Sequence, residues 1–176
     1  MEDNIIYYSI INKKVLGDNS QTIQARTLLK EMLKHFNLEM PEIIISSNGK
    51  PIFKNSNIYF NYSHSNNYIA CAVSLCEIGI DIEETSRIVI DDISKKYLDN
   101  VKGNDKRLET WVKKEAYSKL KGLGLQIGLQ NINLDQIKEK NFFINKKEYM
   151  CAIYSSSDNI EFKELNLYWL TLILLI

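Results

Sequence analysis

Two acidic residues, Asp81 and Glu83, stand two positions apart in the stretch Gly79–Glu83, whose other residues are apolar. In an extended strand alternate side chains share a face, so both carboxylates point one way while Ile80 and Ile82 point the other. Like charges this close repel unless a cation or several donors lie between them, and hard oxygen ligands suit Mg²⁺ or Mn²⁺. The simpler alternative is a half-exposed strand with an acidic outer face, which this pentapeptide alone leaves open.

A second charged pair, Glu115 and Lys119, falls inside the apolar stripe of the helix predicted over residues 105–122. At 100° per residue from Leu108, Glu115 lies at about 340° and Lys119 at about 20°. Charges on an inward face are costly unless they pair with each other or meet charged groups opposite. An i, i+4 salt bridge is the simpler alternative. Bringing Glu115 to the acidic strand would instead form a three-carboxylate cluster, which requires a divalent cation.

Hydrogen-bond donors are concentrated at Ser63-His64-Ser65, which follow a strand expected to begin at Ile58. Two hydroxyls flanking an imidazole, followed by turn residues, predict a loop suited to binding a phosphate. The other histidine, His35, offers no triad partner. Because Gly-x-Ser-x-Gly is also absent from the sequence, a serine hydrolase is disfavoured.

Two further cations accompany apolar or turn residues. Lys50 lies between Gly49 and Pro51, in a turn whose backbone can approach a flat ligand closely, although a turn alone is not a site. Arg26 flanks the buried stripe of a helix expected over residues 22–36. Its guanidinium could reach a phosphate, and the simpler alternative is a surface arginine with a packed stem.

The hydrophobic pattern places these residues in a mixed fold. Long helices are expected at 22–36 and 105–122, and a short one near 91–98. The expected strands are 5–11, 43–45, 58–60, 68–75, 79–83, 131–134, 149–155, 160–165 and 168–176, with a hairpin loop at 155–159. The chain is therefore predicted to be α+β, with two similar α/β half-domains, 1–84 and 85–176, forming a pseudodimer around the site.

Composition narrows the class of protein. The 176 residues are 45% hydrophobic and 25% charged, as in ordinary globular domains, and 22 basic residues balance 22 acidic ones. This balance predicts no nucleic-acid or membrane-surface partner. Three cysteines without Cys-x-x-Cys spacing favour reduced thiols, and the acidic start lacks the features of a signal peptide. The C-terminal run is too short to span a bilayer. We therefore expect a cytoplasmic monomer.

The ordered set of motifs resembles the 4′-phosphopantetheinyl transferase superfamily over roughly residues 20–165. The matching stretches are Gly49-Lys50-Pro51, Phe60-Asn61-Tyr62-Ser63-His64-Ser65, Gly79-Ile80-Asp81-Ile82-Glu83 and Trp111-x-x-Lys114-Glu115-Ala116-x-x-Lys119-x-x-Gly122-x-Gly124-Leu125. Because the Asp-x-Glu motif is preceded by a half-domain, the chain looks like the pseudodimeric, surfactin-synthetase-activating type.

This resemblance implies transfer of 4′-phosphopantetheine from coenzyme A to a serine of an apo acyl- or peptidyl-carrier protein, releasing adenosine 3′,5′-bisphosphate. It implies that Asp81, Glu83 and Glu115 hold Mg²⁺, with Mn²⁺ as the alternative. Lys119 would steady the pyrophosphate. Glu115 or a water on the metal would be the base for the carrier serine.

The resemblance also implies the residues that bind the co-substrate. Coenzyme A phosphates would contact Ser63 and His64, the 3′-phosphate would face Arg26, and the adenine would lie along Lys50 and Pro51. Two departures bear on these roles. The basic segment before the Arg26 helix is reduced to Lys13 and Lys14, and residues 97–102 replace a Phe-Phe-Ser stretch and its following glutamate.

Two other classes remain open. A non-catalytic module that binds coenzyme A or a carrier would fit the shortened segments, although it gains little from a costly inward charge cluster. A metal-dependent nucleotide pyrophosphatase would use the same ion with water as the acceptor. Hydrolysis of coenzyme A without a carrier would be its signature.

Overall fold

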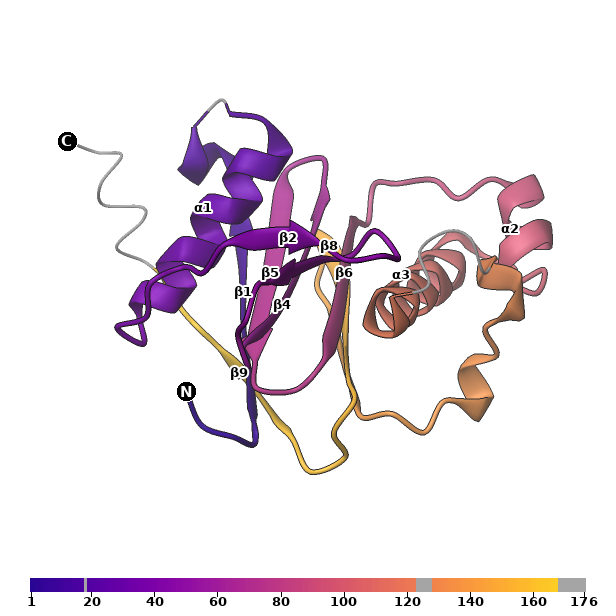
Figure 1. Cartoon of the computed structure of the whole chain (residues 1–176). Helices are drawn as coiled ribbons and strands as arrows, with labels where there is room; N and C mark the ends of the chain where they lie inside the picture. The colour runs from indigo at the N-terminus through magenta and orange to yellow at the C-terminus, as the bar shows by residue number, and fades with distance from the viewer. Residues whose placement is uncertain (18, 123–127, 168–176) are drawn as a thin grey trace.

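The computed structural model describes residues 1–17, 19–122 and 128–167. It is built of four layers, in the order helix, sheet, sheet and helix (Figure 1). The helices are α1 (Gln21–Lys34), α2 (Asp91–Tyr97) and α3 (Asn104–Lys121). The strands are β1 (Ile5–Asn12), β2 (Ile43–Ile45), β3 (Pro51–Phe53), β4 (Tyr59–Ser65), β5 (Tyr68–Ser74), β6 (Ile78–Glu84), β7 (Asn141–Asn145), β8 (Tyr149–Ser155) and β9 (Glu161–Glu164).

The first sheet has the strand order β4-β5-β1-β9, and α1 covers its outer face. β1 pairs antiparallel with β5 and parallel with β9. Helix α1 begins after Ser20, whose hydroxyl accepts a hydrogen bond from the backbone of Ile23. Its buried stripe, which includes Leu28 and Leu29, packs on strand residues such as Val73. The amphipathic pattern of α1 is therefore satisfied by this sheet.

The second sheet has the order β6-β8-β7, all antiparallel, and α3 covers its outer face. The helix approaches β6 closely at Gly79. A Cβ placed on this glycine would lie 2.1 Å from the carbonyl oxygen of Ala116 and 2.3 Å from the amide nitrogen of Leu120. Gly79 therefore sets how near the acidic strand lies to the helix that carries Glu115 and Lys119.

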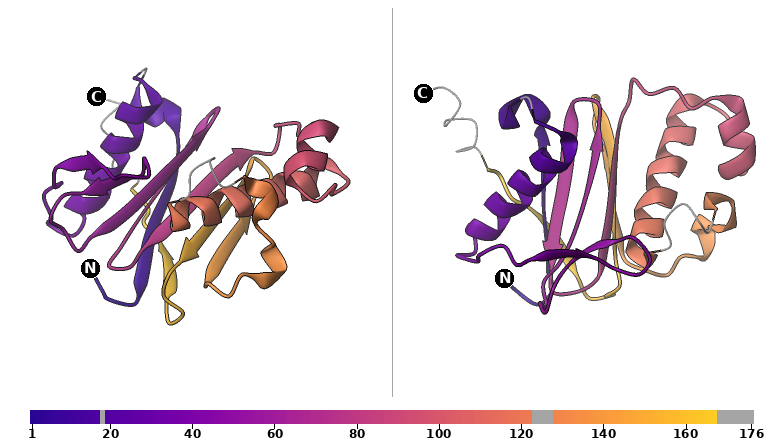
Figure 2. Two further views of the ribbon diagram at one scale, coloured as in Figure 1. Left: turned by 45° about the vertical axis from the view of Figure 1, so that its right-hand side comes forward. Right: turned by 45° about the horizontal axis from the view of Figure 1, so that its top comes forward.

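The two sheets lie face to face (Figure 2). Aliphatic side chains such as Ile6, Ile80 and Ile153 form the core between them. At one side of this sandwich β4 lies beside β6, joined through side chains. The Asn61 Oδ1 atom accepts from the backbone N–H of Ile80 (2.9 Å). The Ser65 hydroxyl accepts in the same way from Glu84 (3.0 Å). Polar side chains of β4 are thus held against the acidic strand.

Most predicted elements are confirmed, since both long helices, the short helix α2 and the strands at 5–11, 43–45, 68–75, 79–83, 149–155 and 160–165 occur with small changes of boundary. Residues 61–65 were expected in a loop and lie within β4 instead. The strand predicted at 131–134 is wrong, because two short 3-10 helices, Leu129–Asn131 and Leu134–Gln136, occupy this region. Strands β3 and β7 were missed. The C-terminal strand predicted at 168–176 lies outside the described residues.

The hairpin predicted around residues 155–159 is also wrong. β8 belongs to the second sheet, whereas β9 pairs with β1 in the first, so the intervening loop crosses between sheets. The mixed α+β class is confirmed. The division into half-domains at residue 84 stays a prediction. Among the described residues, no helix has the length and apolar character needed to cross a membrane.

A candidate active site between strand β6 and helix α3

The alternation of β6 places Asp81 and Glu83 on one face, as expected. Ile80 and Ile82 are fully buried between the sheets. Asp81 and Glu83 face β4 and α3, and they are 5% and 8% exposed, respectively. Carboxylates this buried need donors or cations beside them, because the cost of desolvating a charge is high. The partners of these two carboxylates therefore define the chemistry of the site.

Asp81 is bound by one serine and one lysine. Its Oδ1 atom accepts from the Ser63 hydroxyl at 2.7 Å and from Lys119 Nζ at 2.7 Å. Lys119 Nζ also donates to the Ser63 hydroxyl at 2.9 Å, so the three groups form a closed triangle. The second oxygen, Oδ2, is buried and has no hydrogen-bond partner in the described part of the chain. An unpartnered buried oxygen of this kind favours a further cation or donor.

Glu83 is held by two different donors. Its Oε2 atom accepts from the Ser65 hydroxyl at 2.7 Å, and its Oε1 atom forms an ion pair with Arg87. The Arg87 guanidinium also lies over the Trp111 ring, 4.9 Å from its centre, in a cation–π arrangement. The sequence interpretation assigned no role to Arg87. Its only signal was its position four residues after Glu83.

Glu115 faces the same space from α3. It lines a cavity of about 250 Å³ together with Tyr62, Ser63, His64, Asp81, Glu83, Trp111 and Lys119. Burial, and then the charge of Asp81, raise the pKa of Glu115, while Lys119 and Arg87 act in the opposite direction. These effects place Glu115 within electrostatic reach of the acidic strand. The simple i, i+4 salt bridge is not formed, because Lys119 pairs with Asp81 instead.

The donor chemistry of this cavity fits a hard divalent cation. Three carboxylates line it, and Asp81 Oδ2 is unpartnered. Within residues 1–17, 19–122 and 128–167, however, no group of three or more His, Cys, Asp or Glu side chains has the arrangement of a metal site. Lys119 and Arg87 instead occupy one oxygen each of Asp81 and Glu83. The ligand set therefore stays a prediction.

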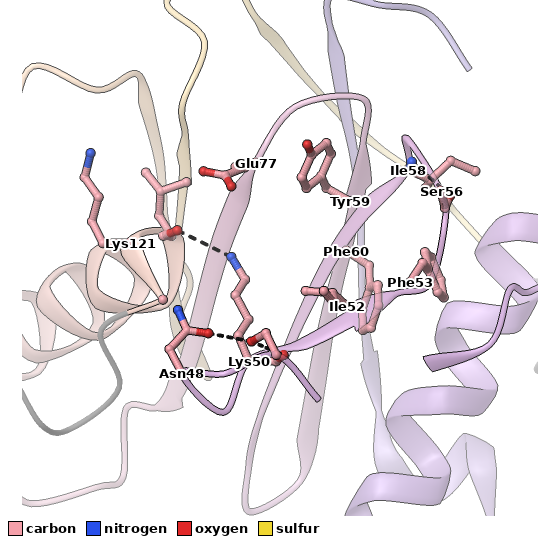
Figure 3. Close-up of a pocket in the computed structure, with 13 residues that line it drawn as sticks. Asn48, Lys50, Ile52, Phe53, Ser56, Ile58, Tyr59, Phe60, Glu77 and Lys121 are labelled. Atoms are coloured by element: carbon pink, nitrogen blue, oxygen red, sulfur yellow. Dashed lines mark hydrogen bonds between the residues drawn. The ribbon is translucent and has the colours of Figure 1, made fainter. Parts of the chain in front are cut away.

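Lys50 was expected to line an adenine site, and the structure gives its amine another contact. Lys50 Nζ donates to the backbone carbonyls of Ile78 (3.1 Å) and Leu120 (3.4 Å), the second of which is drawn in Figure 3. Burial lowers the pKa of this amine. Lys50 thereby fastens the β2–β3 hairpin to the start of β6 and the end of α3.

Two cavities adjoin this lysine on different sides. The first, of about 200 Å³, is lined by Asn48, Gly49, Lys50, Pro51, Asn61, Tyr62, Lys119 and Gly122. The second, of about 340 Å³, has aromatic walls that include Phe53, Tyr59 and Phe60 (Figure 3). The first cavity shares Lys119 with the acidic site, so a ligand lying against Pro51 could extend to Asp81.

His64 and Arg26 were predicted to bind phosphates, and only His64 lines the acidic site. His64 lines the acidic site and a neighbouring cavity of about 340 Å³ that also contains Gln21 and Arg87. Partial burial, and then the charges of Lys13 and Lys119, lower the pKa of His64. Arg26 is exposed on α1 and is not among the residues that line either cavity. The residue of α1 that lines the neighbouring cavity is Gln21.

Lys114 lies next to Glu115 on α3, and its side chain is fully buried. Its Nζ donates to the Tyr97 carbonyl (3.0 Å) and to Asp99 Oδ2 (2.8 Å). Asp99 lies just beyond the end of α2, in the left-handed region at φ 54°. Lys114 therefore anchors the C-terminal end of α2 to α3, and the helical wheel alone could not reveal this partner.

Comparisons with known proteins indicate the family of this chain. The family model described as the 4′-phosphopantetheinyl transferase superfamily matches residues 77–172. The 4′-phosphopantetheinyl transferase gsp of Aneurinibacillus migulanus is 28% identical over 165 residues, which cover 77% of this chain and 69% of gsp. The transferase psf-1 of Bacillus pumilus is 30% identical over 132 residues, covering 67% of this chain and 57% of psf-1.

The transferase Sfp of Bacillus subtilis (strain 168) is 30% identical over 129 residues, and the match covers 62% of this chain and 57% of Sfp. The chain thus matches between 57% and 69% of the length of these three relatives. The region matched by the family model includes β6 and α3, the two elements that form the acidic site.

Proposed function

This chain belongs to the 4′-phosphopantetheinyl transferase superfamily, and on that basis we propose that it modifies carrier proteins. The reaction moves 4′-phosphopantetheine from coenzyme A to a serine of an apo acyl- or peptidyl-carrier protein. A bond forms between the serine oxygen and the phosphorus next to the pantetheine. The bond from this phosphorus to the oxygen that bridges the two phosphates breaks, and adenosine 3′,5′-bisphosphate leaves.

The observation that carries the proposal is the triangle of Asp81, Ser63 and Lys119 in a cavity that also contains Glu83 and Glu115. A pyrophosphate needs its charge neutralised and its oxygens aligned before the bridge breaks. Lys119 supplies one fixed positive charge from α3. The hydroxyls of Ser63 and Ser65 lie at the same edge, each already oriented by an acidic residue.

Adjoining cavities suggest a path for coenzyme A. The cavity beside Pro51 meets the acidic site at Lys119. The acidic site meets the cavity lined by Gln21 and Arg87 at His64. We place the adenine of coenzyme A near Pro51 and the backbone of Lys50. The pyrophosphate would lie at Lys119, and a phosphate of coenzyme A would lie near His64. Arg26 would have to reach this path from the exposed side of α1.

Glu115 is our candidate for the general base. In the metal-free chain, burial and the charge of Asp81 raise the pKa of Glu115, and a carboxylate with a raised pKa is a better proton acceptor than an exposed one. Its Oε atoms would take the proton of the carrier serine. Asp81, Glu83 and Glu115 are the residues proposed to hold Mg²⁺ or Mn²⁺, and the ion would neutralise the pyrophosphate when bound.

The direct test is incubation of the purified chain with coenzyme A, Mg²⁺ and a panel of apo carriers, followed by intact-protein mass spectrometry. A carrier heavier by one phosphopantetheine group supports the proposal. Tight calorimetric binding of coenzyme A without any product would favour a non-catalytic binder instead. Loss of coenzyme A in the absence of carrier would indicate a pyrophosphatase.

A matched pair of variants tests the residue assignment. Glu115→Gln removes the carboxylate at nearly constant volume and should abolish turnover while circular dichroism remains unchanged. Glu109→Gln, on the same helix but in a partly exposed pair with Lys113, should retain it. An active Glu115→Gln variant would remove Glu115 from both the metal set and the base assignment.

A further inference from the structure

Arg87 forms an ion pair with Glu83, whereas Lys119 pairs with Asp81. Both oxygens of Glu83 are engaged, one by the Ser65 hydroxyl and one by Arg87. By contrast, Asp81 keeps an unpartnered buried oxygen. A cation that binds to all three acids would compete with Arg87 at Glu83, whereas Asp81 Oδ2 has no partner to displace.

From these contacts we propose that Arg87 is a built-in competitor of the metal ion, which moves from Glu83 to a phosphate of the co-substrate when the ion binds. This inference rests on the proposed function, because it assumes the same cation and an anionic ligand. It assigns Arg87 a second partner in the neighbouring cavity, whose lining also includes Gln21, His64, Ser65 and Asn66.

The balance of charge gives the physical reason. Three carboxylates in the site, Asp81, Glu83 and Glu115, face the two cations Lys119 and Arg87, which leaves an excess of one negative charge. A divalent ion would reverse this excess, so the repulsion between the ion and a guanidinium on Glu83 favours release of the guanidinium. Lys119 is less free to leave, because the Ser63 hydroxyl also holds it.

The surroundings of Arg87 allow such a movement. Its side chain is 37% exposed, whereas the Glu83 side chain is 10% exposed, so the guanidinium can leave while the carboxylate stays. The guanidinium also lies over the Trp111 ring, 4.9 Å from its centre, which keeps the group at the edge of the site. The neighbouring cavity of about 340 Å³ that includes Gln21 is already lined by Arg87 and His64. A phosphate there would receive a guanidinium, for which planar two-point binding is favourable.

The first measurement is a titration of the metal-free full chain with Mn²⁺, in the absence of nucleotide and carrier. The electron paramagnetic resonance signal of free Mn²⁺ reports how much of the ion is bound. Because a partly exposed ion pair contributes up to about 1 kcal/mol, Arg87→Met should bind Mn²⁺ up to roughly fivefold more tightly than the wild type. Lys54→Met removes one positive charge from an exposed pair with Glu42 and should bind Mn²⁺ as the wild type does. An unchanged or weaker affinity in Arg87→Met would overturn the inference.

The second measurement is calorimetric binding of adenosine 3′,5′-bisphosphate with and without Mn²⁺. In the wild type, Mn²⁺ should increase the nucleotide affinity more than it does in Arg87→Met, because only the wild type releases a guanidinium toward the anion. Equal increases in the two proteins would refute the transfer of Arg87. Arg87→Lys retains the charge without the planar group, so it should keep the metal competition of the wild type and lose part of the coupling.

These outcomes separate the inference from the proposed function. A wild type that binds no Mn²⁺ would undermine the proposed metal site itself. A wild type that binds Mn²⁺, combined with an Arg87→Met variant of unchanged affinity, would reject only the role of Arg87. Thermal unfolding of each metal-free variant establishes that the binding data come from folded protein.

Discussion

Lys119 Nζ lies 2.7 Å from Asp81 Oδ1, and this ion pair joins helix α3 to strand β6 across the candidate site. The Asp81 side chain is 7% exposed and that of Lys119 is 29% exposed, so the pair is only partly open to solvent. It therefore has two consequences. It compensates the buried charge of Asp81, and it holds an ammonium group where the pyrophosphate is proposed to lie.

Lys119→Met should lower turnover by roughly 100-fold or more, because it removes a fixed positive charge from the reacting group. It should also decrease the free energy of unfolding by about 1–3 kcal/mol, since Asp81 loses its counter-charge. Urea unfolding and a mass-based transfer assay measure the two effects. The double variant Asp81→Asn/Lys119→Met should recover part of the stability and none of the activity. Equal stability of Lys119→Met and the wild type would show that the ion pair is energetically unimportant.

Gly79→Ala should disturb the site from a distance. The added Cβ would meet the backbone of α3 at 2.1 Å from the Ala116 oxygen, so the helix must shift away from β6. Overpacking of this kind typically costs about 1–3 kcal/mol. We expect lower thermal stability and lower turnover together, because Glu115 and Lys119 move with the helix. Gly103→Ala provides the contrast, since a Cβ there meets no atom within 4 Å and only its φ of +87° is strained.

Lys114→Met should destabilise the fold without weakening coenzyme A binding. The variant leaves the Tyr97 carbonyl without its donor and removes the contact to Asp99, a loss of about 1–3 kcal/mol. Its neighbour Lys113 pairs with the partly exposed Glu109 and lies over the Phe143 ring, so Lys113→Met should cost less, up to about 1 kcal/mol. Chemical denaturation and calorimetry with coenzyme A distinguish these cases. Weakened coenzyme A binding by folded Lys114→Met would place this lysine in the binding site.

The Lys121–Glu139 ion pair should give a stability difference that depends on pH. The hydrogen bond from Lys121 lowers the pKa of Glu139, and partial burial opposes this effect. A carboxyl group whose pKa is lowered on folding stabilises the fold above its ordinary value of 4.5 and loses this contribution as the pH falls through the folded-state pKa. Glu139→Gln should therefore be less stable than the wild type by up to about 1 kcal/mol near neutral pH. The difference should disappear in acid when both proteins are compared by urea unfolding. A difference that persisted in acid would exclude the ion pair as its cause.

The sequence alone determined the elements and their buried faces. Alternation of Ile80 and Ile82 with Asp81 and Glu83 is a local property of a strand, and the apolar stripe of 105–122 is a local property of a helix. Inward placement of Glu115 and Lys119 followed from this spacing. The spacing left open whether Glu115 and Lys119 would pair with each other or with groups on the acidic strand. The order of the motifs also indicated the family.

Tertiary structure decided the partners. Lys119 pairs with Asp81 and not with Glu115, and Arg87 pairs with Glu83. Lys114 is buried because the end of α2 covers its face of α3. The crossing of β9 to β1 has the same origin, since a strand pattern contains no information about which edge it will join. Periodicity reports which side of an element avoids water, whereas the identity of a counter-charge depends on segments brought together from distant parts of the chain.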